Sequence, residues 1–217
     1  MKSKILPESD LVIFDLDGTL IDSRQDLCNA LNHAMALENL PPISVENMVR
    51  QISKGTKSYL RSLVDHDEEK VDRIFKAYAR AYRKNPLDQT QVYPGTLELL
   101  EHLKKTKPLA LMSNKHQSSC ELVMEGLKIN HYFEVIVGGD LIRKKPHPDA
   151  LSYICDKLGH APEHSVMIGD SVFDLQAAKA INMKCIALTE GFVDEQELRN
   201  EGAHEFYPSV KELWDSL

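Results

Sequence analysis

The side chains that could take part in one reaction occur in four short polar motifs. Each motif follows a short apolar run. They are Asp15-Leu16-Asp17-Gly18-Thr19, Ser113-Asn114-Lys115, Lys145-Pro146, and Gly169-Asp170-Ser171 with Asp174. The set combines two pairs of carboxylates with a hydroxyl and a lysine. Oxygen ligands of this kind suit Mg²⁺. The combination predicts a site that binds Mg²⁺ and transfers a phosphoryl group.

The first motif places two carboxylates directly after an apolar run at residues 11–14. Side chains two apart in an extended segment point to the same side, so Asp15 and Asp17 can face one reaction centre. Open α/β sheets bind their ligands at this end of a strand. An Asp-Gly turn without chemistry is the alternative. A calcium-binding loop is rejected, because Leu20 stands where that loop needs glycine and Asp26 where it needs glutamate.

The second carboxylate pair is Asp170 and Asp174, one helical turn apart and on one face if a helix begins near Ser171. A helix cap formed by Asp170 or Ser171 is the alternative. A cap explains one carboxylate, but not why four acids should gather at strand ends of one sheet. Gathered acids repel one another unless a cation lies among them. We therefore predict a metal site formed by Asp15, Asp17, Asp170 and Asp174.

The remaining two motifs supply groups that could contact a phosphate. Ser113 closes an apolar run and can donate its hydroxyl, while Asn114 lies at an expected helix start with its backbone N–H available. Lys145 can neutralise charge on a nucleophile and a phosphate. The alternatives are a helix cap for Ser113 and Asn114, and a solvated charge for Lys145.

The spacing of apolar residues predicts the elements that must position these motifs. Short continuous apolar runs, typical of strands covered on both faces, occur at residues 11–14, 109–112, 135–137, 166–168 and 185–188. Leucines and other apolar residues repeat at helical spacing within 97–103, 122–127, 151–158 and 175–181. This alternation predicts an α/β fold with a doubly wound parallel sheet.

Residues 22–91 break the alternation, because only helical periodicity occurs there. One amphipathic face runs from Leu27 through Leu31 to Leu37, and another from Val71 to Tyr82. We predict an inserted helical lobe at 22–91 within a core formed by residues 1–21 and 92–217.

Composition excludes several classes of protein. The 217-residue chain has a formal net charge of -7 and no massed basic segment, which argues against binding nucleic acid. No apolar run is long enough to predict a membrane span. The four cysteines lack paired spacing and the nine histidines lack a metal-ligand spacing, so neither set is assigned a metal or disulfide role. We expect a cytoplasmic protein that is a monomer or homodimer.

The four motifs, in this order, resemble those of the haloacid dehalogenase-like superfamily of phosphohydrolases, and the resemblance covers nearly the whole chain. It implies a Rossmann-like core with a small helical cap domain. It also implies a role for each motif residue: Asp15 is the nucleophile, Asp17 the acid/base, Ser113 the phosphate-binding hydroxyl, Lys145 the motif lysine, and Asp170 and Asp174 the metal-site acids. Dehalogenase members lack the second aspartate of the first motif, so Asp17 indicates phosphoryl transfer.

Finer features, including Gly138-Gly139-Asp140 and Lys145-Pro146-His147-Pro148, are most similar to the phosphoglycolate phosphatase-like branch. The resemblance implies Mg²⁺-dependent hydrolysis of a small phosphorylated metabolite through an aspartyl-phosphate. Phosphate-binding residues would be Gly18, Thr19, Ser113, Asn114 and Lys145. Neighbouring branches hydrolyse pyrophosphate or nucleotides, or act as sugar phosphomutases. A non-catalytic Mg²⁺-binding phosphoacceptor domain is a further alternative, although it needs neither Asp17 nor an inserted lobe.

The helical lobe is expected to close over the site and contact the leaving group. Thr56 and Lys57, after Gly55, are the candidate substrate-contacting turn, with Lys54, Lys57 or Arg61 available to a substrate carboxylate. A solvated helix start with scattered charge is the alternative.

Overall fold

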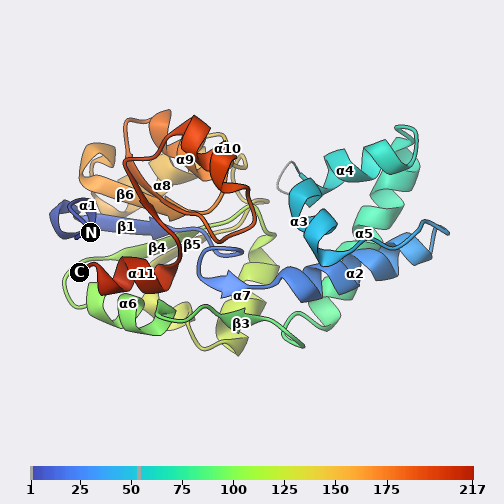
Figure 1. The fold of residues 1–217 in the computed structure, drawn as a ribbon, viewed down its shortest axis with the longest axis horizontal. Helices are drawn as coiled ribbons and strands as arrows, with labels where there is room; N and C mark the ends of the chain where they lie inside the picture. The colour runs from blue at the N-terminus through green and yellow to red at the C-terminus, as the bar shows by residue number, and fades with distance from the viewer. Residues whose placement is uncertain (1, 53–54) are drawn as a thin grey trace. The chain divides into compact units, whose positions relative to one another are not determined.

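The computed structural model of the chain describes residues 2–52 and 55–217. The chain divides into two compact units (Figure 1). The core unit comprises Met1–Asp22 and Val92–Leu217, and the helical unit comprises Ser23–Gln91.

The core unit is built on a six-stranded sheet in the order β5-β4-β1-β6-β7-β8. The strands are β1 (Leu11–Phe14), β4 (Leu109–Met112), β5 (Val135–Val137), β6 (Ser165–Gly169), β7 (Lys184–Leu188) and β8 (Glu205–Tyr207). All neighbouring strands pair in parallel. From β1 the chain adds β4 and β5 on one side and then β6, β7 and β8 on the other. The predicted doubly wound α/β fold is therefore confirmed, with its topological switch point beside β1.

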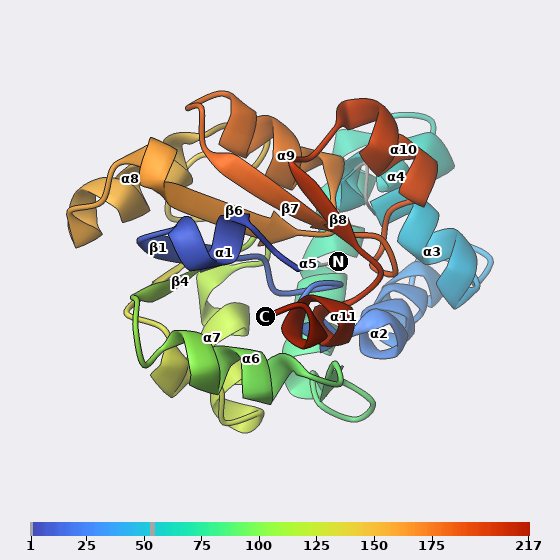
Figure 2. The same cartoon turned by 60° about the vertical axis from the view of Figure 1, so that its left-hand side comes forward.

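Helices cover both faces of this sheet (Figures 1 and 2). One face is covered by α8 (Asp149–Leu158), α9 (Val172–Lys179) and α10 (Glu195–Glu201), and the other by α6 (Thr96–Leu103), α7 (Gln117–Gly126) and α11 (Val210–Asp215). Leu11 and Ile13 of β1 belong to the cluster formed with the first layer, and Val12 and Phe14 between them are equally buried. Burial on both faces explains why the strand is continuously apolar.

The chain also contains several short elements. They are α1 (Ile5–Glu8), the 3₁₀ helices η1 (Asn130–Tyr132) and η2 (Pro162–His164), and a separate two-stranded sheet of β2 (Ile21–Asp22) and β3 (Gln91–Val92). The small sheet and β8 were not predicted. The edge strand β8 reads Glu-Phe-Tyr and lacks a continuous apolar run.

Some predicted helix faces are wrong in detail. Leu97 and Leu122 are exposed, because α6 buries Leu99, Leu100 and Leu103 and α7 buries a different set of positions. A repeat of three residues drifts around a helix of 3.6 residues per turn, so it does not stay on one face.

The helical unit contains α2 (Arg24–Ala36), α3 (Val45–Ile52), α4 (Thr56–Leu63) and α5 (Glu68–Lys84). Both predicted amphipathic faces are buried at most of their positions, for example Leu31 on α2 and Ile74 on α5. Leu37 is exposed, because α2 ends at Ala36. None of the helices within the described ranges is both long and apolar enough to cross a membrane.

A buried carboxylate joins the first and last segments of the helical unit. Asp26, in the first turn of α2, is only 3 % exposed. It accepts hydrogen bonds from the backbone of Gln89 at 2.9 Å, from the backbone of Thr90 at 2.8 Å and from the Thr90 hydroxyl at 2.7 Å. Because these donors point at one acceptor group, Asp26 fixes the start of α2 against the segment before β3.

We predict that Asp26→Asn lowers the free energy of unfolding by about 1–3 kcal/mol, because a buried N–H loses its acceptor and the new amide group brings a donor toward other donors. Urea denaturation measures the change. Asp88→Asn is the matched control, since Asp88 is an exposed acid close to the same segment. Equal effects of the two substitutions would contradict a special role for the buried carboxylate.

Candidate active site

The carboxyl ends of three adjacent strands bring the predicted motifs together. Asp15 follows β1, Ser113 follows β4 and Asp170 follows β6, and these strands pair in parallel register. Asp174 lies in the first turn of α9, directly after β6. Asp15, Asp170 and Asp174 are all buried, and each offers a carboxylate oxygen within 4.8 Å of the others.

Among the residues that the structure describes, Lys145 contributes the ammonium group that lies inside this cluster. Its Nζ lies 2.8 Å from Asp15 Oδ1 and 2.6 Å from Asp174 Oδ1, and it donates to the Met112 carbonyl at 3.3 Å. Burial alone would lower the pKa of Lys145, but the Asp15 and Asp174 carboxylates outweigh this effect and raise it. The ammonium therefore stays charged beside the candidate nucleophile.

A single ammonium does not balance the buried carboxylates around it. Burial raises the pKa of Asp15 to about 7, with Lys145 opposing the shift and Asp174 adding to it. The pKa of Asp170 is also raised well above its usual value, first by burial and then by the charges of Asp15 and Asp174. The cluster thus holds more negative charge than its surroundings stabilise.

The donor set fits a hard cation. All three clustered groups are carboxylates, and such cations prefer oxygen ligands. The contact of Asp15 Oδ1 with Lys145 lacks hydrogen-bond geometry, which leaves this buried oxygen without a hydrogen-bond partner among the described residues. Asp15, Asp170 and Asp174 could therefore hold a divalent ion.

Asp170 is held by the first motif and by the loop after β7. The Thr19 hydroxyl donates to Asp170 Oδ1 at 2.7 Å, and the Phe192 backbone donates to Oδ2 at 2.7 Å. Gly18 has φ of +87°, and a Cβ there would lie 2.2 Å from Asp170 Oδ2; a Cβ on Gly191 would lie 2.2 Å from Asp170 Cβ. Gly18 and Thr19 thus contact the acid in this structure, and their predicted contact with phosphate stays a prediction.

Asp174 belongs both to a helix cap and to the acid cluster. Helix α9 has Ser171 as its N-cap, close to the predicted start, and Asp174 completes a capping box. Asp174 Oδ2 accepts from the Ser171 backbone at 3.0 Å and from its hydroxyl at 2.6 Å, while Oδ1 accepts from Lys145 at 2.6 Å. The cap fixes the carboxylate in place, so the two alternatives are compatible.

Asn114 anchors the backbone of the motif lysine. Its Nδ2 donates to the Lys145 carbonyl at 3.1 Å, and the Lys145 backbone N–H donates to its Oδ1 at 2.9 Å. The helix start expected at Asn114 is wrong, because α7 begins at Gln117 and residues 113–116 form a loop. Ser113 is 5 % exposed at the start of this loop. The predicted phosphate contacts of Ser113 and Asn114 stay predictions.

Asp17 is paired with Lys115, a residue of the second motif to which the sequence assigned no role of its own. Lys115 Nζ lies 2.7 Å from Asp17 Oδ1 and 2.8 Å from Oδ2. The spacing could have indicated that Lys115 lies at the site, because Lys115 follows Ser113 by two residues and can face the same side of an extended loop. The Asp17 carboxylate lies outside the cluster of Asp15, Asp170 and Asp174. The expected metal contact of Asp17 is through its backbone carbonyl, and it stays a prediction.

The candidate residues Thr56 and Lys57 of the helical unit lie at the start of α4, which begins at Thr56, and Arg61 lies in the last turn of this helix. Lys57 Nζ lies 2.7 Å from Asp72 Oδ1, and Arg61 forms two hydrogen bonds to Glu68 at 2.5 and 2.9 Å. These cations are neutralised by acids of α5 at the surface. Lys54 lies outside the described residues.

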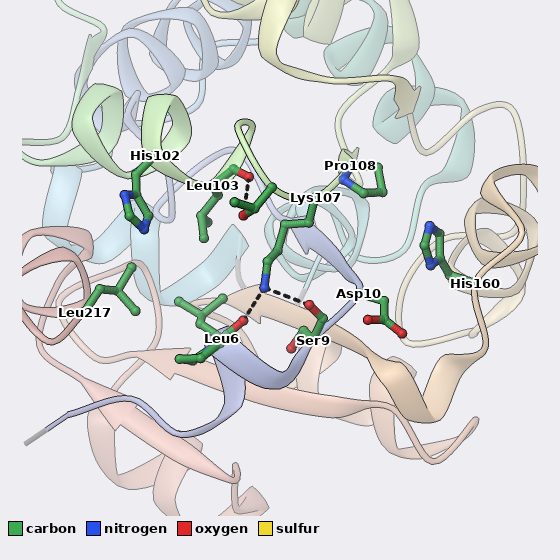
Figure 3. A pocket seen from close by; sticks show the side chains of 11 residues that line it. Leu6, Ser9, Asp10, His102, Leu103, Lys107, Pro108, His160 and Leu217 are labelled. Atoms are coloured by element: carbon green, nitrogen blue, oxygen red, sulfur yellow. Dashed lines mark hydrogen bonds between the residues drawn. The ribbon is translucent and has the colours of Figure 1, made fainter.

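A pocket of about 540 Å³ lies at the opposite edge of the sheet (Figure 3). Residues that precede β1, β4 and β6 line it, so it is remote from the acid cluster. Its Lys107 donates to the carbonyls of Leu6 at 2.6 Å and Ser9 at 2.7 Å. These bonds tie the end of α1 to the start of β4, which gives the ammonium a structural role.

The chain is similar to known proteins over most of its length. The model of the haloacid dehalogenase-like hydrolase family matches residues 12–188. The phosphoglycolate phosphatase of Chromobacterium violaceum is 35 % identical, with 95 % of each chain covered. The phosphoglycolate phosphatase of Escherichia coli K12 is 32 % identical, with 95 % of this chain and 91 % of the relative covered.

Two solved structures are also similar to this chain over most of its length. A crystal structure from Haemophilus somnus, described as a predicted phosphoglycolate phosphatase, superposes with a TM-score of 0.88 at 26 % identity and covers 96 % of this chain and 97 % of its own. A predicted phosphatase from Clostridium acetobutylicum has a TM-score of 0.84 at 27 % identity, with 95 % and 97 % covered.

We predict that Gly18→Ala lowers the affinity for Mg²⁺ by about tenfold or more, because the new Cβ would displace the Asp170 carboxylate, and groups that orient a metal ligand have effects of this size. Isothermal titration calorimetry measures the affinity. Gly159→Ala is the matched control: Gly159 also has a positive φ, of +73°, but a Cβ there meets no atom within 4 Å. Unchanged affinity in Gly18→Ala would contradict the assignment of Asp170 to a metal site.

The raised pKa values of Asp15 and Asp170 predict how cation binding depends on pH. Without a cation, the folded protein holds these protons at pH values where the unfolded chain has lost them. This contribution to stability is present at low pH and is lost as the pH rises through about 7 for Asp15. A cation binds the ionised form and offsets the loss. The rise in melting temperature on adding Mg²⁺ should therefore grow between about pH 5.5 and pH 8.

Differential scanning calorimetry at several pH values, each with Mg²⁺ and with chelator, checks this dependence. Asp170→Asn is expected to abolish most of the Mg²⁺ effect. A Mg²⁺ effect of equal size at every pH, or one retained in Asp170→Asn, would contradict cation binding at the acid cluster.

Proposed function

The chain belongs to the haloacid dehalogenase-like hydrolase family, and we propose that it is a Mg²⁺-dependent phosphatase that hydrolyses a small phosphomonoester. The observation that carries the proposal is the buried contact of Asp15 with Lys145 beside Asp170 and Asp174. A carboxylate held beside an ammonium and a candidate cation site is equipped to attack a phosphorus atom that carries negative charge.

The Mg²⁺ site would be formed by the carboxylates of Asp15 and Asp170 and the backbone carbonyl of Asp17, with Asp174 bound directly or through water. The ion would supply positive charge that offsets the phosphate oxygens. Lys145 adds a second positive charge at Asp15. Without this screening, an anionic nucleophile would have to approach an anionic ester.

In the first step, an Asp15 oxygen forms a bond to phosphorus and the bond from phosphorus to the ester oxygen breaks. Asp17 gives a proton to the departing alcohol. In the second step, water attacks the aspartyl-phosphate, Asp17 accepts a proton from that water, and phosphate leaves with Asp15 restored. A positioned acid or base contributes about 10²–10⁴-fold to the rate. Positioning and electrostatics must supply the larger part of the acceleration.

The names of the relatives support a phosphoglycolate-like substrate, since both curated relatives above are phosphoglycolate phosphatases. We propose a small phosphorylated metabolite of this kind, with Gly18, Thr19, Ser113, Asn114 and Lys145 as phosphate-binding residues. We further propose residues 1–21 and 92–217 as the catalytic core domain and 22–91 as the cap domain, with Thr56 and Lys57 as its substrate-contacting residues.

Asp15→Asn is expected to abolish phosphate release and Asp17→Asn to impair it severely, because the first removes the nucleophile and the second the proton carrier. The assay is a panel of phosphorylated metabolites, including phosphoglycolate, pyrophosphate, nucleotides and sugar phosphates, with Mg²⁺ and with chelator. Asp10→Asn is the control, because Asp10 is exposed at the opposite edge of the sheet. Near-wild-type turnover by Asp15→Asn, or no Mg²⁺-dependent turnover across the panel, would overturn the proposal.

A further inference from the structure

Each of the two aspartates in the first motif contacts its own lysine. Lys145 contacts Asp15, and Lys115 contacts both oxygens of Asp17. The side chains of Lys115 and Asp17 are 7 % and 17 % exposed, so this ion pair is largely withdrawn from water. We propose that Lys115 is a positioning residue that holds Asp17 for proton transfer, an inference that rests on the proposed phosphatase activity.

The backbone of Lys115 is itself fixed by a neighbouring loop. The Gly139 N–H donates to the Lys115 carbonyl at 2.8 Å, and the Lys115 N–H donates to the Ser113 hydroxyl at 3.3 Å. Since both backbone groups are bound, the direction in which the side chain leaves the loop is set. A long, flexible lysine then begins from a fixed point, which reduces the entropy lost when it pairs with Asp17.

The neighbouring loop is Gly138-Gly139-Asp140, which the sequence singled out but the proposed mechanism does not use. Its glycines permit contact of two backbones: a Cβ on Gly138 would lie 2.4 Å from the Gln117 backbone, and one on Gly139 would lie 2.6 Å from the Asn114 carbonyl. Asp140 accepts a hydrogen bond from the Gln117 N–H at 2.6 Å, and the Gly138 N–H donates to the Gln117 side chain at 2.6 Å. The loop therefore anchors both ends of the segment that presents Lys115.

Contact of one ammonium with both carboxylate oxygens restricts Asp17 more than a single hydrogen bond does. With Nζ at 2.7 and 2.8 Å from the two carboxylate oxygens, rotation of the carboxylate lengthens at least one contact. A proton carrier must lie at the correct place relative to the leaving oxygen, and small misplacements have large effects on rate. The contacts of Gly139 with Lys115 and of Lys115 with Asp17 thus set the position of the proposed acid/base.

The dependence of rate on the leaving group tests this role. An alkyl ester needs a proton as its alcohol departs, whereas 4-nitrophenolate leaves without one. Lys115→Met should therefore lower kcat/KM for 2-phosphoglycolate about tenfold more than kcat/KM for 4-nitrophenyl phosphate, within the range that acid catalysis supplies. Lys115→Arg retains the charge and should restore part of the loss. Lys105→Met, at an exposed lysine remote from the site, should change neither value.

Equal losses for the two esters would assign Lys115 to phosphate binding or to folding, and no loss would remove it from the mechanism; both results overturn the proposal. Crystal structures of the wild type and Lys115→Met give a readout that does not depend on turnover. We expect Asp17 to leave its wild-type position or to adopt several rotamers in the variant, and an unmoved Asp17 would also overturn the proposal. If the wild type hydrolysed neither ester, the proposed function would fail. The two crystal structures would still test whether Lys115 holds Asp17 in place.

Discussion

The structure depends on carboxylates that are buried together around one ammonium group. Asp15, Asp170 and Asp174 lie at the carboxyl edge of a parallel sheet, and Lys145 lies among them. Taking several acids out of water is costly, and one ammonium offsets only part of that cost. The raised pKa values of Asp15 and Asp170 reflect the part of this cost that the ammonium does not offset. A further cation is the simplest group that completes the charge balance, and in the proposed mechanism this cation also offsets the charge of the phosphate oxygens. Stability and proposed chemistry therefore have a common electrostatic origin.

Backbone geometry makes this crowding possible. Glycines stand where two segments meet at distances that a side chain would prevent: Gly18 and Gly191 flank Asp170, and Gly139 lies against Asn114. Loops that lack side chains at these points bring their polar groups together at the carboxyl end of the sheet. The loop after β4 is the clearest example. It anchors the Lys145 backbone through Asn114 and the Asp17 carboxylate through Lys115, so one turn supports both lysines that contact the first motif.

Much of the fold and the location of the acid cluster could be predicted from the sequence, because both follow from local patterns. Strands β1 and β4 are continuously apolar, β6 is apolar at residues 166–168, and Asp15 and Asp170 follow β1 and β6 directly. Features that depend on distant partners could not be predicted. Residues 113–116 resemble a helix start, but tertiary hydrogen bonds to Lys145 and Gly139 hold them as a loop. The Lys115 contact joins residues 98 positions apart, and β8 is a strand only because it pairs with β7.

The central claim is that the Asp15 carboxylate attacks phosphorus, and mass spectrometry of enzyme quenched with acid during turnover tests it most directly. The account predicts a phosphoryl adduct on the peptide that contains Asp15, formed with Mg²⁺ present and absent when chelator is added first. Accumulation of the adduct should be greater in a variant that slows hydrolysis of the intermediate. Steady turnover with a phosphoryl adduct on another residue would contradict the account.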